Sequence, residues 1–247
     1  MTVDNNLNGP LPPEIGYLLD CFAIGLENNI RLSGVLPETM GNMIILETLA
    51  VLLNGPKFGG EIPSSLFRLK NLITIQIQDN LGKNWSLPSS VQVGEDTRLE
   101  SLSLSRSGIT DTIPSWLTKL SSLQTLDLSR NNFQGGIPDT IGDLSSIKYL
   151  SLMDNNLTET IPSSIGKLSA IEALLLGNNQ LRGELPASIG NLQTLLLLDV
   201  GSNEMTSTLP PSFANLSSLS KCVCCQMITY RGVYGGYLLT SLLLLSR

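Results

Sequence analysis

The stretch from Leu123 to Ile171 contains two consecutive copies of one 24-residue pattern. The apolar, asparagine and proline positions of the first copy all recur 24 residues later. These positions are Leu123, Leu126, Leu128, Asn131, Phe133, Ile137, Pro138, Ile141 and Leu144, matched by Ile147, Leu150, Leu152, Asn155, Leu157, Ile161, Pro162, Ile165 and Leu168. A unit of this length cannot bury its apolar face alone, so neighbouring copies have to stack on one another.

Each copy contains an alternating segment that predicts a short strand. Leu126 and Leu128 alternate with Thr125, Asp127 and Ser129, so the leucines point to one side and the polar residues to the other. Placing the same strand of the next copy alongside produces a parallel sheet with a continuous leucine core. The fold class we expect is therefore an α/β solenoid, right-handed and curved, with the parallel β-sheet on its concave face and loops and short 3₁₀ turns on its convex face.

The asparagine and the proline of each copy have separate roles. Asn131 and Asn155 enter the coil as the chain turns away from the strand, where an amide can satisfy backbone groups of neighbouring coils. Pro138 and Pro162 have no N–H group, so they suit the point where an extended segment ends and the outer turn begins. In the fifth copy Ser107 replaces the asparagine, and its shorter side chain should satisfy fewer neighbours.

The prolines at 12, 37, 63, 88, 114, 138, 162, 186 and 210 divide the chain into nine repeats. A partial tenth strand follows, with Leu219, Cys222 and Cys224 in leucine positions and Cys225 facing outward. We therefore expect a solenoid over residues 1–224, with a truncated first repeat, and a non-repeat tail over 225–247. The absence of a cap before the first repeat suggests a truncated chain. The apolar run near the end is too short to span a bilayer.

Composition excludes several functions. The formal charge of −6 opposes binding of a nucleic-acid backbone. The sequence has no histidine, which removes the commonest general base and metal ligand. The clustered cysteines lack the paired spacing of a zinc site, and Cys21 lies about eight coils from them, where we expect it to fill a buried apolar position. We predict no catalytic residues, no metal and no cofactor.

Other residues have two competing interpretations. Trp85 could contact a ligand, but a filler of a widened fourth coil is the interpretation we favour. Threonine pairs at Thr110 and Thr112, Thr158 and Thr160, and Thr206 and Thr208 occur on every second coil. Ordered water or ice binding would need such pairs on successive coils, so we retain an ice-binding surface only as a remote alternative.

The full pattern, LQTLDLSRNNFQGGIPDTIGDLSS, resembles the plant-type leucine-rich repeat of plant and algal receptor-like kinases, receptor-like proteins and secreted glycanase inhibitors. The resemblance covers residues 2 to about 224, although Asp111, Glu159 and Ser207 stand where the pattern has glycine. It implies an extracellular or cell-surface, glycosylated, non-catalytic ectodomain that binds a protein, peptide or glycan on its concave face, with membrane attachment only through a segment absent from this chain. The alternatives are a glycanase-inhibitor-like protein and an intracellular scaffold.

Three sequons give candidate glycosylation sites at Asn84, Asn156 and Asn215. Asn156 is the most informative, because it follows the buried Asn155 and should point outward.

The candidate ligand site lies among strand residues that face away from the core. We call the repeat asparagine, or Ser107 in its place, the ladder residue. The position just before it is occupied in successive coils, roughly 5 Å apart, by Asp79, Arg106, Arg130, Asp154, Asn178 and Ser202. We expect the ligand-binding residues to be Gln76, Gln78, Asp79, Arg106, Asp127, Arg130, Tyr149 and Asp154. Two adjacent guanidinium groups would receive a carboxylate or sulfate of a peptide or glycan. The alternative is a surface network in which both arginines pair with Asp79, Asp127 and Asp154.

Overall fold

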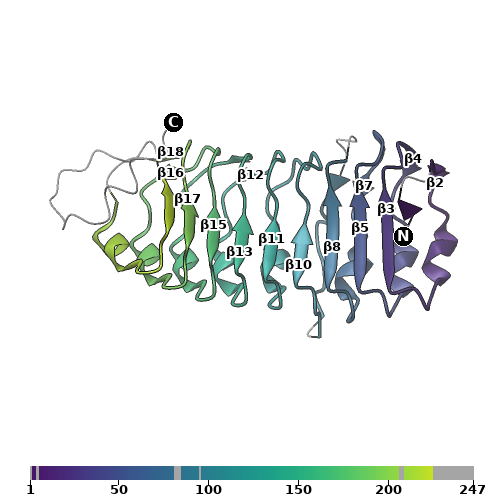
Figure 1. The fold of residues 1–247 in the computed structure, drawn as a ribbon, viewed down its shortest axis with the longest axis horizontal. Coiled ribbons are helices and arrows are strands. Elements are labelled where there is room, and N and C mark those ends of the chain that lie inside the picture. Colours follow the sequence, from purple (N-terminus) through teal and green to yellow (C-terminus); the bar gives the residue numbers. More distant parts are fainter. Residues whose placement is uncertain (1, 4–5, 81–84, 95, 206–208, 225–247) are drawn as a thin grey trace.

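The computed structural model describes residues 2–3, 6–80, 85–94, 96–205 and 209–224, and all statements on structure concern these residues. They form an elongated solenoid in which each coil places one strand beside that of the previous coil (Figure 1). The ten-stranded sheet consists, in spatial and sequence order, of β1 (Thr2–Val3), β3 (Ala23–Glu27), β5 (Thr48–Leu52), β8 (Thr74–Gln78), β10 (Ser101–Ser103), β11 (Thr125–Asp127), β13 (Tyr149–Ser151), β15 (Ala173–Leu175), β17 (Leu197–Asp199) and β19 (Lys221–Val223).

All pairings in this sheet are parallel, and the register follows the repeat. Leu126 of β11 pairs with Leu102 of β10 on one side and with Leu150 of β13 on the other. The predicted solenoid with a parallel sheet is thereby confirmed. We use "sheet face" for the side of this sheet that points away from the core.

The outer side of the solenoid carries short 3₁₀ helices. They are η1 (Pro13–Tyr17), η2 (Glu38–Asn42), η3 (Ser64–Arg68), η4 (Ser115–Lys119), η5 (Asp139–Asp143), η6 (Ser163–Lys167), η7 (Ala187–Asn191) and η8 (Pro211–Asn215). Each starts directly after a repeat proline, as predicted; Pro138, for example, is extended at φ −63° and ψ 140°. Among the described residues of the fourth coil, no helix follows Pro88, which agrees with the irregular sequence there.

Between the main strands and the 3₁₀ helices, short parallel pairs connect the coils along one edge. These are β2 (Asn8–Pro10), β4 (Arg31–Gly34) and β6 (Lys57–Phe58) in one sheet, β7 (Gly60–Glu61) with β9 (Trp85–Ser86), β12 (Gln134–Gly135) with β14 (Asn156–Leu157), and β16 (Arg182–Gly183) with β18 (Glu204–Met205).

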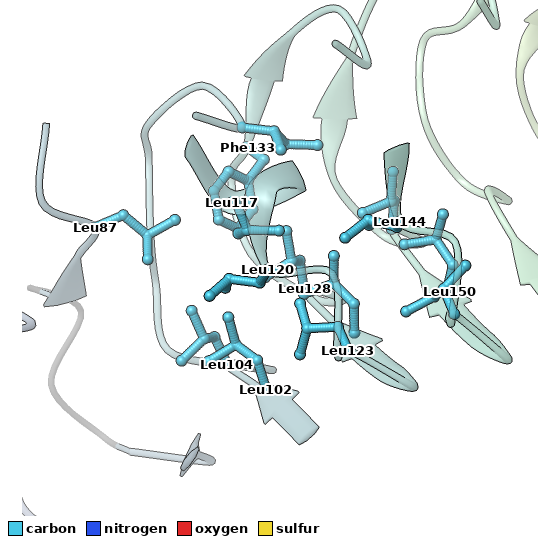
Figure 2. Packing of buried hydrophobic residues seen from close by; sticks show 14 of the residues in the cluster. Leu87, Leu102, Leu104, Leu117, Leu120, Leu123, Leu128, Phe133, Leu144 and Leu150 are labelled. Atoms are coloured by element: carbon cyan, nitrogen blue, oxygen red, sulfur yellow. The ribbon is translucent and has the colours of Figure 1, made fainter. Parts of the chain in front are cut away.

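Leucine and isoleucine side chains fill the space between the sheet and the outer turns (Figure 2). Leu126, Leu128 and Phe133 are fully buried, and the equivalent residues of the next coil pack directly on them. Trp85 is also buried, 2% exposed, with its ring edge-on to Phe58 at 5.6 Å between centroids, so it fills the core as expected. Cys224 is buried in the tenth coil, whereas Cys21 is only partly buried against the core; Cys225 lies outside the described residues.

Buried asparagines join the coils by hydrogen bonds. Asn155 accepts the Phe133 N–H at 3.0 Å, and its Nδ2 group donates to Leu128, Leu152 and Met153 carbonyls at 3.0 to 3.2 Å. Asn29, Asn54, Asn80, Asn131, Asn179 and Asn203 are buried at the equivalent positions. Ser107 supplies only a hydroxyl, which donates to the Ile77 carbonyl at 2.6 Å and to its own coil at Ser105. The predicted ladder role of the asparagines is confirmed.

We expect the register to be visible in stability. Leu152 is 1% exposed, whereas Met153 is only partly buried on the sheet face. Leu152→Asp places an unpaired carboxylate in the core and should cost about 4 kcal/mol or more, whereas Met153→Asp should cost about 1 kcal/mol or less. Thermal and urea unfolding followed by circular dichroism would measure both. Equal losses would contradict this assignment of inward and outward residues.

A second substitution tests the ladder. Asn155→Ala removes four hydrogen bonds and leaves the Phe133 N–H buried without its acceptor, so we expect a loss of about 2–4 kcal/mol. The matched control is Asn156→Ala at the next residue, which is exposed and should change stability by about 0.5 kcal/mol or less. A ladder variant as stable as its control would show that the asparagine does not connect the coils energetically.

Candidate ligand site on the sheet face

The largest group of predicted site residues meets in one open hollow on the sheet face. The hollow has a volume of about 260 Å³ and is lined by Asp79, Ser105, Arg106, Asp127, Ser129, Arg130, Tyr149, Ser151 and Met153. These residues come from four consecutive coils, with Asp127 on β11 and Tyr149 and Ser151 on β13 near the middle of the solenoid (Figure 1). The repeat thus brings together residues 70 positions apart in the sequence.

The two arginines do not lie on strands, which corrects the sequence interpretation. β10 ends at Ser103 and β11 at Asp127, so Arg106 and Arg130 each lie three residues beyond a strand, in a left-handed turn with φ 53° and φ 57°. The same left-handed backbone recurs just before the ladder position at Asn28, Leu53, Asp79, Arg106, Arg130, Asp154, Asn178 and Ser202, with φ between 51° and 57°. We call these eight residues the left-handed row.

Hydrogen bonds between coils hold the left-handed row in place. The Arg106 N–H donates to the Ser129 carbonyl at 3.2 Å, and the Arg130 N–H donates to the Met153 carbonyl at 3.0 Å. A left-handed conformation is unfavourable for residues other than glycine, asparagine and aspartate, so these contacts must stabilise it at the arginines. The N–H groups of the residues from Asn28 to Asn178 in the row all donate to a carbonyl of the next coil in this way, so the row holds these backbones in one repeated conformation.

Each arginine forms an ion pair with an aspartate of the same row, in opposite directions along the solenoid. Arg106 contacts Asp79 at 3.2 Å, one coil towards the N-terminus, and Arg130 contacts Asp154 at 3.4 Å, one coil towards the C-terminus. Both arginine side chains remain about half exposed, at 55% and 50%. Each of these ion pairs uses one guanidinium nitrogen, so most N–H donors of each arginine remain available to a ligand.

Asp127 and Tyr149, unlike the two arginines, line the hollow without forming an ion pair among the described residues. The Asp127 carboxylate accepts the Ser129 N–H at 3.0 Å, and no ion pair joins Asp127 to an arginine among the described residues. Burial raises the pKa of the Tyr149 phenol, and the nearby Asp127 carboxylate raises it further. The phenol therefore stays protonated at neutral pH and can donate a hydrogen bond. The hollow offers guanidinium and hydroxyl donors together with two carboxylates, of which Asp79 is paired with Arg106 and Asp127 forms no ion pair among the described residues.

Three predicted residues lie outside the lining of the hollow. Asp154 belongs to the ion pair with Arg130 and accepts the Asn178 amide at 2.7 Å. Gln78 donates to the Ser103 hydroxyl, and Gln76 lies opposite Ser103 in the register of β8 and β10. Sequence reasoning did not select Ser105, Ser129 and Met153 as lining residues. The signal was present, because they occupy the residue before the left-handed row in three successive repeats.

The described sequon asparagines and paired threonines do not line the hollow. Asn156, on β14, and Asn215, the last residue of η8, are exposed, and Asn84 lies outside the described residues. Thr110, Thr112 and Thr160 are exposed and Thr158 is partly exposed; Thr206 and Thr208 are outside the described residues. Thr112 and Thr160 form isolated bridges with Gln134 and Arg182, so the intervening coils present other side chains there.

The described residues provide neither a metal-binding cluster nor a membrane-spanning helix. They contain no group of three or more histidine, cysteine or acidic side chains placed to hold a metal ion. None of their helices has the length and apolar character needed to cross a membrane.

Family models for leucine-rich repeats match two parts of the chain. A leucine-rich repeat model matches residues 97–157, and a leucine-rich repeat region model matches residues 134–232. Among curated proteins, receptor-like protein 32 of Arabidopsis thaliana is 32% identical over 121 residues, which are 49% of this chain and 13% of that protein. The two model matches together cover residues 97–232, which include the regular repeats.

Solved structures extend the similarity to most of the chain. The ectodomain of the Arabidopsis thaliana membrane receptor kinase GASSHO1/SCHENGEN3, solved in complex with Casparian strip integrity factor 2, is 32% identical with a TM-score of 0.79, covering 88% of this chain and 25% of that one. A TDR receptor structure is 25% identical with a TM-score of 0.75, covering 89% of this chain and 38% of that one.

The chain spans only an eighth of the curated relative and between a quarter and two fifths of the two receptor structures. The similarity therefore concerns the repeats themselves. The chain therefore has the leucine-rich repeat fold, and in sequence and structure it resembles the ectodomains of plant leucine-rich repeat receptors.

Proposed function

We propose that the chain is a non-catalytic recognition module, part of a receptor-like protein, that binds an acidic peptide, protein segment or glycan on the sheet face. The observation that carries the proposal is the pair of half-exposed arginines on adjacent coils beside the hollow, in a protein whose formal charge is −6. Similarity to a receptor ectodomain solved in complex with a partner supports a binding role over an enzymatic one.

The geometry favours a carboxylate or sulfate as the anchoring group. Guanidinium forks recognise planar anions with paired hydrogen bonds, and fixed backbones reduce the entropy lost on binding. Asp79 and Asp154 flank the arginines and keep them oriented, but their single contacts leave room for a stronger two-point interaction. Exposed pairs of this kind contribute little to folding, so their conversion to ligand contacts costs little stability.

Asp127 narrows the chemistry of the ligand further. Its carboxylate lies in the hollow with no cationic partner among the described residues, beside a protonated Tyr149 phenol. A bare anion would be repelled by Asp127, whereas a ligand with N–H or O–H donors next to its anionic group would satisfy both. Peptide amides and sugar hydroxyls provide such donors, so we propose a peptide or glycan with one acidic group rather than a free ion.

The first test of this function removes the arginine pair. Peptides that bind the purified chain would be selected from a random phage-displayed library. Their affinities would then be measured by calorimetry for the unmodified chain and for the double variant Arg106→Ala, Arg130→Ala. Loss of two charge-assisted contacts should weaken binding about 100-fold or more while the melting temperature stays nearly unchanged.

Arg182→Ala is the matched control for this test. Arg182 is 63% exposed and forms an ion pair with Glu204 at 2.8 Å, but it lies on β16, away from the sheet face. This control should bind peptides like the unmodified chain. Full affinity in a folded Arg106→Ala, Arg130→Ala protein would place the binding site elsewhere.

The second test concerns the cell surface. Expression through a eukaryotic secretory pathway should give a protein that loses mass on glycosidase treatment, since Asn156 is exposed within an Asn-Leu-Thr sequon. Asn156→Gln should remove one glycan from the intact mass, whereas Asn132→Gln, at the equivalent exposed position of the preceding coil and outside any sequon, should remove none. A protein secreted without any glycan would favour the intracellular scaffold instead.

A further inference from the structure

Between β8 and β17, the outward-facing residues of the sheet change from mostly polar to partly aliphatic. Two rows of outward-facing residues run across the sheet, one residue from each strand, and the strand register aligns them. The first row reads Thr74, Ser101, Thr125, Tyr149, Ala173, Leu197 and Lys221, and the second reads Gln76, Ser103, Asp127, Ser151, Leu175, Asp199 and Val223. Ala173 and Leu175 on β15 and Leu197 on β17 are therefore aliphatic, whereas Asp199 on β17 is charged. Strand β15 is the neighbour of β13, which carries two residues of the hollow (Figure 1).

We define the aliphatic strip as Ala173, Leu175 and Leu197. All three are partly exposed, whereas Leu174 and Leu198, their neighbours on β15 and β17, are fully buried on the core side. The fold does not need leucine in these rows, because other coils have threonine, serine or aspartate there. Contiguous exposed apolar side chains mark contact sites on many proteins. Leu197 faces Ala173 across β15 and β17, and Leu175 faces Asp199, which borders the strip.

The aliphatic strip is continuous with the hollow. Ala173 pairs with Tyr149, and Leu175 pairs with Ser151, so the strip begins one strand beyond two residues that line the hollow. Met153, also in the lining, adds an apolar side chain on the same side. A ligand held at the arginines would thus have an apolar surface towards the C-terminal end of the solenoid. Towards the N-terminal end it would have a polar surface that includes Gln76 and Ser101.

We propose that the aliphatic strip binds an aliphatic side chain of the same extended peptide whose carboxylate contacts Arg106 and Arg130. This inference rests on the proposed function of the sheet face. Adjacent strands are ~4.8 Å apart, and Arg130 also lies three to five residues further along the strand direction than Leu175 and Leu197. The arginines and the strip are therefore separated by about 14–22 Å, or about four to seven residues of extended peptide. The ligand class is therefore a peptide with one acidic and one aliphatic residue at a fixed separation.

The test compares peptide selections on matched proteins. A phage-displayed library of random decapeptides is selected on the unmodified chain and on Leu175→Ser, Leu197→Thr. These substitutions introduce the residues found in the same rows at Ser151 and Thr125, so the fold should tolerate them. Leu196→Ser is the control, because Leu196 adjoins the strip in sequence and is 44% exposed, but lies just before β17 and outside both rows.

We expect peptides selected on the unmodified chain to combine an acidic residue with Leu, Ile or Val about four to seven positions away. The Leu175→Ser, Leu197→Thr variant should bind these peptides about tenfold more weakly. Peptides selected on this variant should keep the acidic residue but lose the preference for an aliphatic one. The Leu196→Ser control should behave like the unmodified chain.

Failure of this inference can be separated from failure of the proposed function. Binders that depend on Arg106 and Arg130 but show no aliphatic preference would overturn the strip and retain the arginine site. Binders insensitive to the arginine substitutions would overturn both. A dimer in analytical ultracentrifugation that Leu175→Ser, Leu197→Thr dissociates would assign the strip to a second copy of the chain and also overturn the peptide subsite.

Discussion

Buried hydrogen bonding between coils is the constraint on which the rest of the structure depends. One coil of this chain has neither a closed core nor a full set of backbone partners. Leu126 and Leu150 pack across adjacent strands, and Asn155 connects the backbone of its own coil to that of the preceding one. Each coil is therefore stable only next to its neighbours, as expected for a solenoid in which stability is shared between adjacent repeats.

This coupling leaves the sheet face free to vary. Because the core needs apolar residues only at inward positions, the outward rows can change from coil to coil without disturbing the register. The left-handed row illustrates this freedom. It contains asparagine, leucine, aspartate, arginine and serine side chains on one backbone conformation, and the intercoil hydrogen bonds stabilise that conformation even where the residue does not favour it. A rigid repeat can thus carry a site of individual chemistry.

The candidate site combines opposite charges in a way that suits a composite ligand. Arg106 and Arg130 are oriented by flanking aspartates, Asp127 remains in the hollow, and the apolar strip begins one strand further on. Each element alone is common on protein surfaces. Their adjacency on one rigid face supports a peptide with several kinds of group, since fixed side chains lose little entropy on binding.

The repeat period, strand positions, ladder asparagines and outer turns were predictable from the sequence, because leucine spacing and the roles of asparagine and proline are local and recur in each coil. The sequence also indicated five of the residues that line the hollow, since equal positions in successive repeats must be neighbours. Only the tertiary structure showed that Arg106 and Arg130 lie past the strands in left-handed turns, that they pair with Asp79 and Asp154 rather than Asp127, and that Gln76 and Gln78 lie apart. Those features depend on backbone torsions set by hydrogen bonds to the next coil and on the directions of long side chains, which the order of residues within one repeat does not determine.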